Sequence, residues 1–159
     1  MTGVGGRRKR PVAIAADHGG VHLKAELARY LEGAGYPVLD LGTDSPDPVD
    51  YPDYGFAAAE AVRRGEADRA ILICKSGIGM AIAANKVQGI RAAPGGSGAE
   101  AEISRRHNAA NVLVLSAYGV PPAEGTRIVE TFLATPFDGG RHSRRLDKIR
   151  AFERDHWKD

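Results

Sequence analysis

The residues best suited to chemistry lie between Ala70 and Asn85, and they include the only cysteine, Cys74. A short apolar run typical of a buried strand ends at Cys74, and the glycine-bearing turn 76–79 follows before a segment rich in helix formers. In parallel sheets, ligands bind where the carboxyl end of a strand meets the next helix. Backbone N–H groups at such a turn have no partner within the helix and can hold an anion. We therefore expect an oxyanion or phosphate cradle beside Cys74.

Cys74 admits two interpretations. A lone cysteine is commonly a small buried hydrophobic residue. The strand-end position, the adjacent helix start and the neighbouring Lys75 instead favour the thiolate, which is the reactive form. The residue types alone leave both interpretations open. A catalytic role requires the sulfur to face an open pocket at the rim of the sheet.

Asp17 and His18 end an earlier predicted strand, so parallel topology would place them at the same edge of the sheet as Cys74. Asp17 could simply cap the helix that begins near Gly20, and His18 could be a polar loop residue. A carboxylate and an imidazole beside a cysteine nevertheless favour a functional site.

A second polar group lies toward the C-terminus. His107 and Asn108 stand at a predicted helix end, where a cation or an asparagine cap would explain both without a function. Arg141 and Arg145 are four residues apart and share a predicted helix face. They could belong to a solvated charged surface or could bind a phosphate.

Strands and helices alternate along the chain to position these residues. Strands are predicted at 11–16, 37–41, 70–74, 90–93 and 111–115. Helices are predicted from near 20 to 33, after the 76–79 turn, and at about 54–64, 100–107, 122–133 and 142–157, while 42–52 is expected to be a loop. This alternation predicts one doubly wound α/β domain, with a Rossmann-like parallel sheet of about five strands and helices on both faces.

The two ends of the chain have separate predictions. Residues 1–10 are rich in Gly and Arg and are expected to form a disordered basic tail, with the domain over 11–159. The last predicted helix carries Leu146, Ile149, Phe152 and Trp157 among many charges. We therefore expect it to pack on a partner subunit.

Composition excludes several functional classes. With 43% hydrophobic and 26% charged residues, the chain has the composition of a soluble globular protein, and no apolar run approaches a membrane span or signal peptide. One cysteine cannot form an internal disulfide, which favours the cytoplasm. The net charge of +2 comes from four basic residues among the first ten, and the remainder is slightly acidic, so nucleic acid is not an expected partner.

The sequence contains no complete cofactor or metal motif. A phosphate-binding G-x-x-x-x-G-K-[ST] loop is absent, and Gly77-Ile78-Gly79 lacks the complete dinucleotide fingerprint. The sequence has no closely spaced His and Cys set that suggests zinc. We therefore expect neither a cofactor nor a metal.

Several motifs occur together and in a fixed order: DHGG at 17–20, DYP at 50–52, CKSGIGM at 74–80, AANK at 83–86, GIRA at 89–92, HN at 107–108 and GRH at 140–142. On these motifs the chain resembles the ribose-5-phosphate isomerase B family, which includes galactose-6-phosphate isomerase subunits, over about Pro11 to Glu153. The resemblance implies aldose–ketose interconversion of a phosphorylated sugar through an enediolate, without metal or cofactor. Ribose 5-phosphate, in the pentose phosphate pathway, is the first expected substrate. It also implies a homodimer, or a tetramer, whose sites form between two subunits.

The resemblance implies roles for individual residues as well. Cys74 matches the base that moves a proton between C1 and C2, and the backbone of 76–81 would hold the enediolate oxygen. His107 matches the acid that helps to open the sugar ring, with Asp17 assisting proton transfer on oxygen; Ser76 keeps the hydroxyl of this catalytic set. The implied substrate-binding residues are Asp17, His18, Tyr51, Ser76, Gly77, Ile78, Gly79, Met80 and Asn108, with Arg141 and Arg145 for the phosphate.

Four features depart from the usual family pattern. Lys75 and Ala109 replace a glycine and an acidic residue, the 94–98 loop lacks the usual larger side chains, and Tyr118 stands near the place of a phosphate-binding arginine. The isomerisation machinery is kept, but the sugar is left open. The alternatives are an isomerase of a different aldose or sugar phosphate, a non-catalytic sugar-phosphate-binding relative and, less favoured, a flavodoxin-like phosphate or nucleotide binder.

Overall fold

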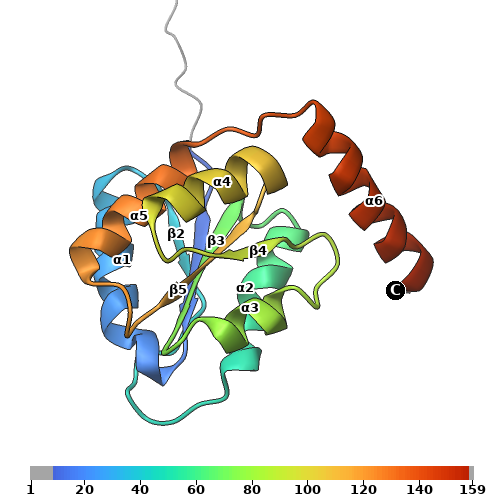
Figure 1. The fold of residues 1–159 in the computed structure, drawn as a ribbon. Helices are drawn as coiled ribbons and strands as arrows, with labels where there is room; N and C mark the ends of the chain where they lie inside the picture. Colours follow the sequence, from blue (N-terminus) through green and yellow to red (C-terminus); the bar gives the residue numbers. More distant parts are fainter. Residues whose placement is uncertain (1–8, 158–159) are drawn as a thin grey trace, which may run out of the picture.

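A sheet of five parallel strands forms the middle layer of the protein, in the order β2-β1-β3-β5-β4 (Figure 1). The structure is a computed structural model and describes residues 9–157. The strands are β1 (Val12–Ala16), β2 (Val38–Asp40), β3 (Arg69–Cys74), β4 (Ala92–Pro94) and β5 (Val112–Ser116). The predicted doubly wound sheet of about five strands is confirmed.

Helices cover both faces of this sheet. They are the short 3-10 helix η1 (His18–Gly20) and the helices α1 (Val21–Gly33), α2 (Tyr51–Arg63), α3 (Ile78–Ala84), α4 (Gly98–Asn108), α5 (Pro122–Ala134) and α6 (Arg141–His156). The helices α1, α4 and α5 pack on one face, and α2 and α3 pack on the other. Helix α6, red in Figure 1, lies outside these layers and contacts them through Glu153, whose Oε1 accepts from Gly89 N–H at 3.2 Å.

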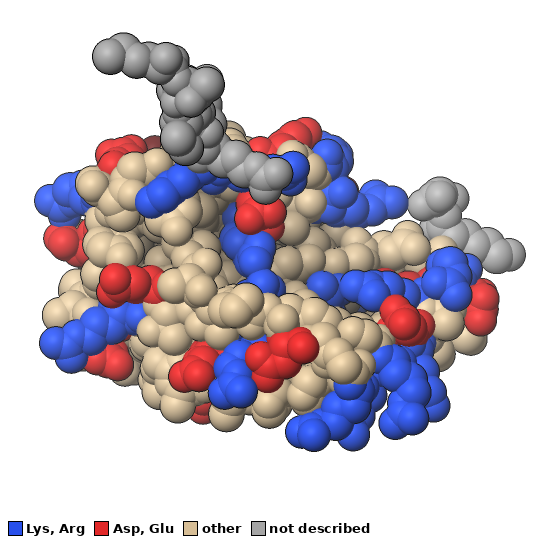
Figure 2. Space-filling view, turned by 90° about the horizontal axis from the view of Figure 1, so that it is seen from above, with Lys and Arg blue, Asp and Glu red and all other residues tan. Residues whose placement is uncertain are grey.

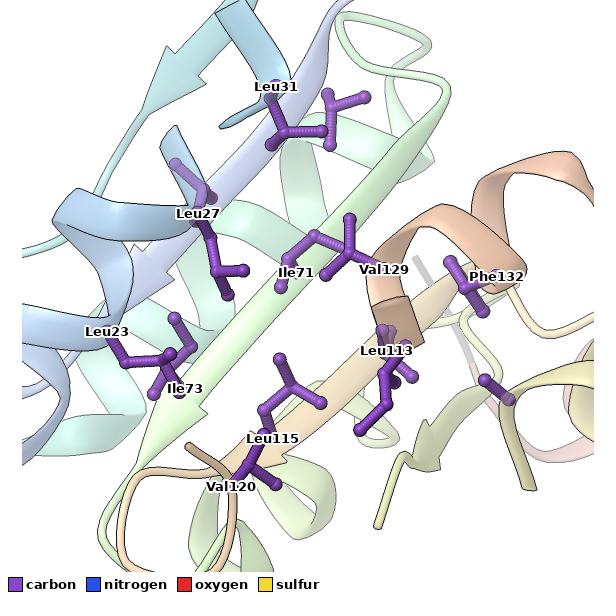
Figure 3. Packing of buried hydrophobic residues seen from close by; sticks show 14 of the residues in the cluster. Leu23, Leu27, Leu31, Ile71, Ile73, Leu113, Leu115, Val120, Val129 and Phe132 are labelled. Carbon is purple, nitrogen blue, oxygen red and sulfur yellow. The ribbon is translucent and has the colours of Figure 1, made fainter. Parts of the chain in front are cut away.

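The core is divided by the sheet because successive strand residues point to opposite faces. In β3, Ile71 and Ile73 face the α1 and α5 side, whereas Leu72 and Cys74 face α2 and α3. Leucines at every fourth position of α1 form the apolar stripe that the sequence predicted, and Figure 3 shows them against β3 and β5. The strand that ends at Cys74 is therefore held from both sides.

The register aligns the ends of the three central strands. Ala16 of β1 pairs with Ile73, and Cys74 pairs with Ser116 of β5. The Asp17 N–H also donates to the Ile73 carbonyl at 3.2 Å. As expected from the topology, Asp17 and Cys74 thus lie at one edge of the sheet, called here the carboxyl edge; the opposite edge, where the strands begin, is the amino edge.

Two predicted boundaries were wrong. Helix α2 begins at Tyr51, three residues before the predicted start, because Pro52 fits the first helical turn, where no N–H partner is required. Strand β4 begins at Ala92 rather than Ile90. The side-chain amide of Asn85 holds this start, since it accepts from Ala92 N–H and donates to Ala92 O.

The structure describes the two ends of the chain only in part. The prediction of a disordered tail concerns mainly residues 1–8, which lie outside the described residues. Lys9 donates to the Ala34 carbonyl at 2.6 Å and stacks over Tyr36 at 4.1 Å. Within residues 9–157, no helix is long and apolar enough to cross a membrane.

Candidate functional site

Cys74 lies at the end of β3 and is 5% exposed. Its Sγ accepts a hydrogen bond from Gly77 N–H at 3.2 Å. An N–H that points at sulfur stabilises negative charge there, as a reactive cysteine requires. The same side chain packs with Met80 and Ala15 in the core, so the buried position expected of a structural cysteine is also present.

The turn after Cys74 supplies further amides, but not all of them are free. Gly77 adopts a left-handed conformation with φ 79°, which lets the chain turn sharply into α3. Its own N–H is taken by the Cys74 sulfur, and Ile78 N–H donates to Ser76 Oγ at 3.2 Å. The amides of Gly79 and Met80, within the first helical turn, are those without a partner inside the helix. The predicted cradle is therefore narrower than the 76–81 segment.

Asp17 and His18 meet this turn from β1. Asp17 is 7% exposed, and its Oδ1 accepts from Gly19 N–H at 2.9 Å, so it does cap the short helix η1. The Nδ1 of His18 accepts from Val49 N–H at 3.1 Å. A neutral His18 must then carry its proton on Nε2, which makes that nitrogen a donor.

Tyr51 reaches the same turn from α2. A Cβ built on Gly79 would lie 2.6 Å from Cζ of the Tyr51 ring, so the ring lies directly over the Gly79 backbone. This close approach explains why a glycine occupies the position. Met80, the last residue of the predicted turn, is fully buried, with its sulfur near Gly55.

Buried Lys24 holds the loop that leads to Tyr51 through two exposed carboxylates. The Lys24 side chain is 2% exposed and donates to Asp40 at 2.7 and 2.9 Å and to Asp44 at 2.6 Å. Burial acts to lower the pKa of Lys24, but the hydrogen bonds and charges of both carboxylates outweigh it and raise this pKa. Gly42 lets the loop pass against β1, since its Cβ would lie 2.5 Å from the Ala16 nitrogen. The loop and β1 are thus locked together beside Asp17.

A cavity of about 370 Å³ adjoins the Cys74 turn. Ser76 and Gly77 line it on one side, and Gly95 and Gly96 line it on the other. The second wall is the glycine-rich loop that departs from the usual family pattern. Its remaining lining residues, mostly apolar, are Ile78, Ala81, Ile82, Pro94, Glu100, Val114 and Ser116, and Cys74 itself is not among them.

The second polar group gathers at the amino edge. His107 and Asn108 are the last two residues of α4, and the Asn108 carbonyl accepts from Arg91, just before β4. Arg141 and Arg145 lie in the first turns of α6 and are exposed. Figure 2 shows Lys and Arg side chains gathered at its right, where α6 lies. The asparagine cap, one of the two non-functional explanations for this helix end, is not formed, because the left-handed residue that ends α4 is Ala109, with φ 44°.

His142 stacks on His107, a contact that the sequence analysis missed. The ring centroids are 4.3 Å apart and the rings are nearly parallel, at 12°. Burial, and then the charges of His107, Arg141 and Arg145, lower the pKa of His142 below 6.5. The signal in the sequence was its spacing: His142 and the buried Leu146 are four residues apart and share the buried face of α6.

Asp138 completes a cluster whose donor atoms lie within 4.8 Å of those of His107 and His142. These residue types can bind metals. However, a metal lies close to the plane of each imidazole that binds it, and two stacked parallel rings do not point at one ion. Asp138 is also bound by Arg106 at 3.2 Å, and that pairing raises the pKa of Arg106. These three residues therefore do not present a converging set of ligands to one metal ion.

The two groups lie at opposite edges of the sheet within one chain. Helix α4 starts after the end of β4 and runs back to the start of β5, so His107 precedes Val112. Cys74 pairs with Ser116 at the far end of the same strand. Four residues of strand separate these levels, which is roughly 13 Å. The structure thus brings Cys74, Asp17, His18, Tyr51 and Ser76–Met80 together, and it keeps His107, Asn108, Arg141 and Arg145 apart from them.

Comparisons with known proteins bear on both groups. The family model described as Ribose/Galactose Isomerase matches residues 12–149. The chain belongs to this family. Among its relatives, a putative sugar phosphate isomerase of Bacillus subtilis, YwlF, is 45% identical over 143 residues, covering 89% of this chain and 96% of that protein. Ribose-5-phosphate isomerase B of Escherichia coli is 41% identical over 144 residues, covering 91% of this chain and 97% of that protein.

Solved structures of ribose-5-phosphate isomerase B share the fold. That of Clostridium thermocellum superposes with a TM-score of 0.90 at 47% identity, covering 92% of this chain and 99% of the other. That of Mycoplasma genitalium, which has ribulose 5-phosphate bound, gives a TM-score of 0.87 at 41% identity, covering 91% of this chain and 97% of the other. The ribose/galactose isomerase match extends from β1 into α6 and therefore includes Cys74, His107 and Arg145.

The packing of Tyr51 on Gly79 is open to a direct test. We expect Gly79→Ala to destabilise the protein by about 1–3 kcal/mol, because the new methyl group would force the ring to move and the helix propensity of alanine regains only about 1 kcal/mol. Gly33→Ala, at a helical position with nothing within 4 Å of the added Cβ, is the matched control. Urea unfolding measures both variants. Equal stability of Gly79→Ala and Gly33→Ala would contradict the contact.

The lowered pKa of His142 predicts a pH dependence of stability. The unfolded chain binds this proton more readily than the folded one, so the contribution of His142 is full above pH 6.5 and is lost as the pH falls toward its lowered pKa. We expect the free energy of unfolding, measured from about pH 8 to about pH 5 at fixed protein concentration, to fall less steeply in His142→Asn than in the wild type. His22→Gln, at an exposed histidine of α1, should keep the wild-type slope. An unchanged slope in His142→Asn would refute the assignment.

Proposed function

We propose that this protein interconverts ribose 5-phosphate and ribulose 5-phosphate through an enediolate. One observation carries the proposal: the Cys74 sulfur, with a backbone N–H directed at it, lies at a strand end beside Asp17 and His18. Relatives at 41–47% identity are named ribose-5-phosphate isomerase B, and one of their structures holds ribulose 5-phosphate. A step of the pentose phosphate pathway would follow from this activity.

The proposed isomerisation moves one proton between adjacent carbons. The Cys74 thiolate removes the proton from C2 of the open-chain aldose, and the electron pair forms the C1–C2 double bond while O1 becomes negative. The Cys74 thiol then returns the proton to C1. A proton also leaves O2 and one is gained on O1, and Asp17, at the same edge of the sheet as Cys74, is the group proposed to transfer it. The net result is a ketose, with no electron gained or lost.

Negative charge on the enediolate requires fixed donors. The amides of Gly79 and Met80 point out of the first turn of α3, and Ser76 adds a hydroxyl beside them. The proposed neutral His18 adds its Nε2–H donor, because Val49 already occupies Nδ1. These groups are held before substrate arrives, which is what makes such donors effective.

A second copy of the chain completes the proposed site. Cys74 needs His107 as the acid that opens the sugar ring, and Arg141 and Arg145 as phosphate ligands, yet all three lie at the other edge of their own chain. Helix α6 leaves Ile149 46% and Phe152 58% exposed. Exposed apolar side chains on this outer helix suit a homodimer whose sites are shared between subunits. The single cysteine suits a reducing cytoplasm, which we propose as the location.

Proton transfer can be followed directly. Purified protein is incubated in D₂O with ribose 5-phosphate, and deuterium at C1 of the ketose and C2 of the aldose is measured by NMR. We expect exchange and net conversion in the wild type and a loss of at least about 100-fold in Cys74→Ala, since one positioned base contributes on the order of 10² to 10⁴.

A panel of other aldose phosphates tests the substrate in the same assay. Exchange with another sugar and none with ribose 5-phosphate would assign a different substrate. Absence of exchange with every sugar, or undiminished exchange in Cys74→Ala, would contradict the proposed mechanism.

A further inference from the structure

The loops of the carboxyl edge are acidic, and they contain a single Lys or Arg. These loops are 17–20, 41–50, 75–77, 95–97 and 117–121. They carry Asp17, Asp44, Asp47 and Asp50 against one cation of their own, Lys75, and Asp44 is paired with Lys24 of α1. A sugar phosphate approaching this edge therefore meets mostly like charge. Among the residues of these loops, only Lys75 can offset this repulsion with a positive charge of its own.

The position of the Lys75 side chain allows it to offset the negative charge of these loops. Its side chain lies against Gly19, where an added Cβ would be 2.4 Å from Lys75 Cγ and 3.1 Å from Cε. The missing side chain of Gly19 thus leaves the space along which the lysine stem runs. The ammonium group lies 5.9 Å from the centre of the Tyr118 ring, at the outer limit of a cation–π contact. The aliphatic stem of Lys75 therefore rests against Gly19, and its ammonium group extends past this glycine toward Tyr118.

The ammonium of Lys75 is not neutralised by a carboxylate. The residue is exposed, and among residues 9–157 it forms no salt bridge with Asp or Glu. Lys24, by contrast, is buried and fully engaged by Asp40 and Asp44. The position next to Cys74 also matters, because the four-carbon stem of a lysine spans about 6 Å and can reach groups several bonds away from C2.

We infer that Lys75 binds the phosphate group of the substrate from the same chain that supplies Cys74. The inference rests on the proposed function, which places C2 of a sugar phosphate at the sulfur. Lys75 then acts together with Arg141 and Arg145 of the second copy, and the phosphate is held from both chains. Its role is in binding and in the choice of anionic substrates, and not in favouring the thiolate as the sequence suggested, since the Gly77 N–H is the donor that contacts the Cys74 sulfur.

Three variants test this role. Lys75→Met removes the charge and keeps the stem, Lys75→Arg keeps the charge, and Lys86→Met makes the same change at an exposed lysine just after α3. We expect Lys75→Met to raise KM for ribose 5-phosphate roughly tenfold or more, with kcat within about threefold, as for loss of one charge-assisted contact. Lys75→Arg should recover most of this loss, and Lys86→Met should match the wild type.

Binding of inorganic phosphate, followed by calorimetry in the same four proteins, supplies a readout that does not need turnover. We expect Lys75→Met to weaken it by a similar factor. If the wild type binds phosphate through Lys75 but does not isomerise any sugar, the proposed function fails and the anion site remains. Wild-type KM and phosphate affinity in Lys75→Met would overturn the inference. A change confined to the pH profile of kcat would overturn it too, because Lys75 would then act on Cys74.

Discussion

The direction of the helices relative to the strands is the constraint on which the functional account depends. In a parallel sheet every connecting helix runs back against the strands, so a helix begins at the carboxyl edge and ends at the amino edge. Helix α4 therefore carries His107 away from Cys74, and no rotation of side chains closes a gap of four strand residues. Chemistry that uses both residues requires two chains.

Each edge is built by different physical means. At the carboxyl edge, backbone geometry dominates: the Cys74 sulfur, Asp17 and His18 are all fixed by N–H groups, and Tyr51 lies on a bare Gly79. The buried Lys24 fastens the adjoining loop to this edge. At the amino edge, side chains dominate, with stacked imidazoles among arginines on α4 and α6. One edge offers donors for a developing oxyanion and the other offers positive charge for a phosphate.

The sequence predicted the fold well because periodicity and turn residues carry that information. Apolar runs such as 70–74 and the leucine stripe of α1 specify a strand and a helix directly. The boundaries at Tyr51 and Ala92 depend instead on the proline in the first helical turn and on the side chain of Asn85. The grouping at the carboxyl edge followed from topology alone. The stacking of His142 on His107 could not be predicted in this way, because the two residues lie on helices far apart in the sequence and no local pattern specifies their contact.

The most direct test of a site shared between two chains mixes two disabled variants. Cys74→Ala and His107→Asn, each expected to be inactive or impaired alone, are unfolded and refolded together so that subunits exchange. A hybrid dimer then has one site with both changes and one with neither, so activity should recover to about one quarter of the wild-type value for random pairing. Activity of the mixture no greater than the sum of the two separate variants, with exchange confirmed by a tag on one of them, would contradict the account.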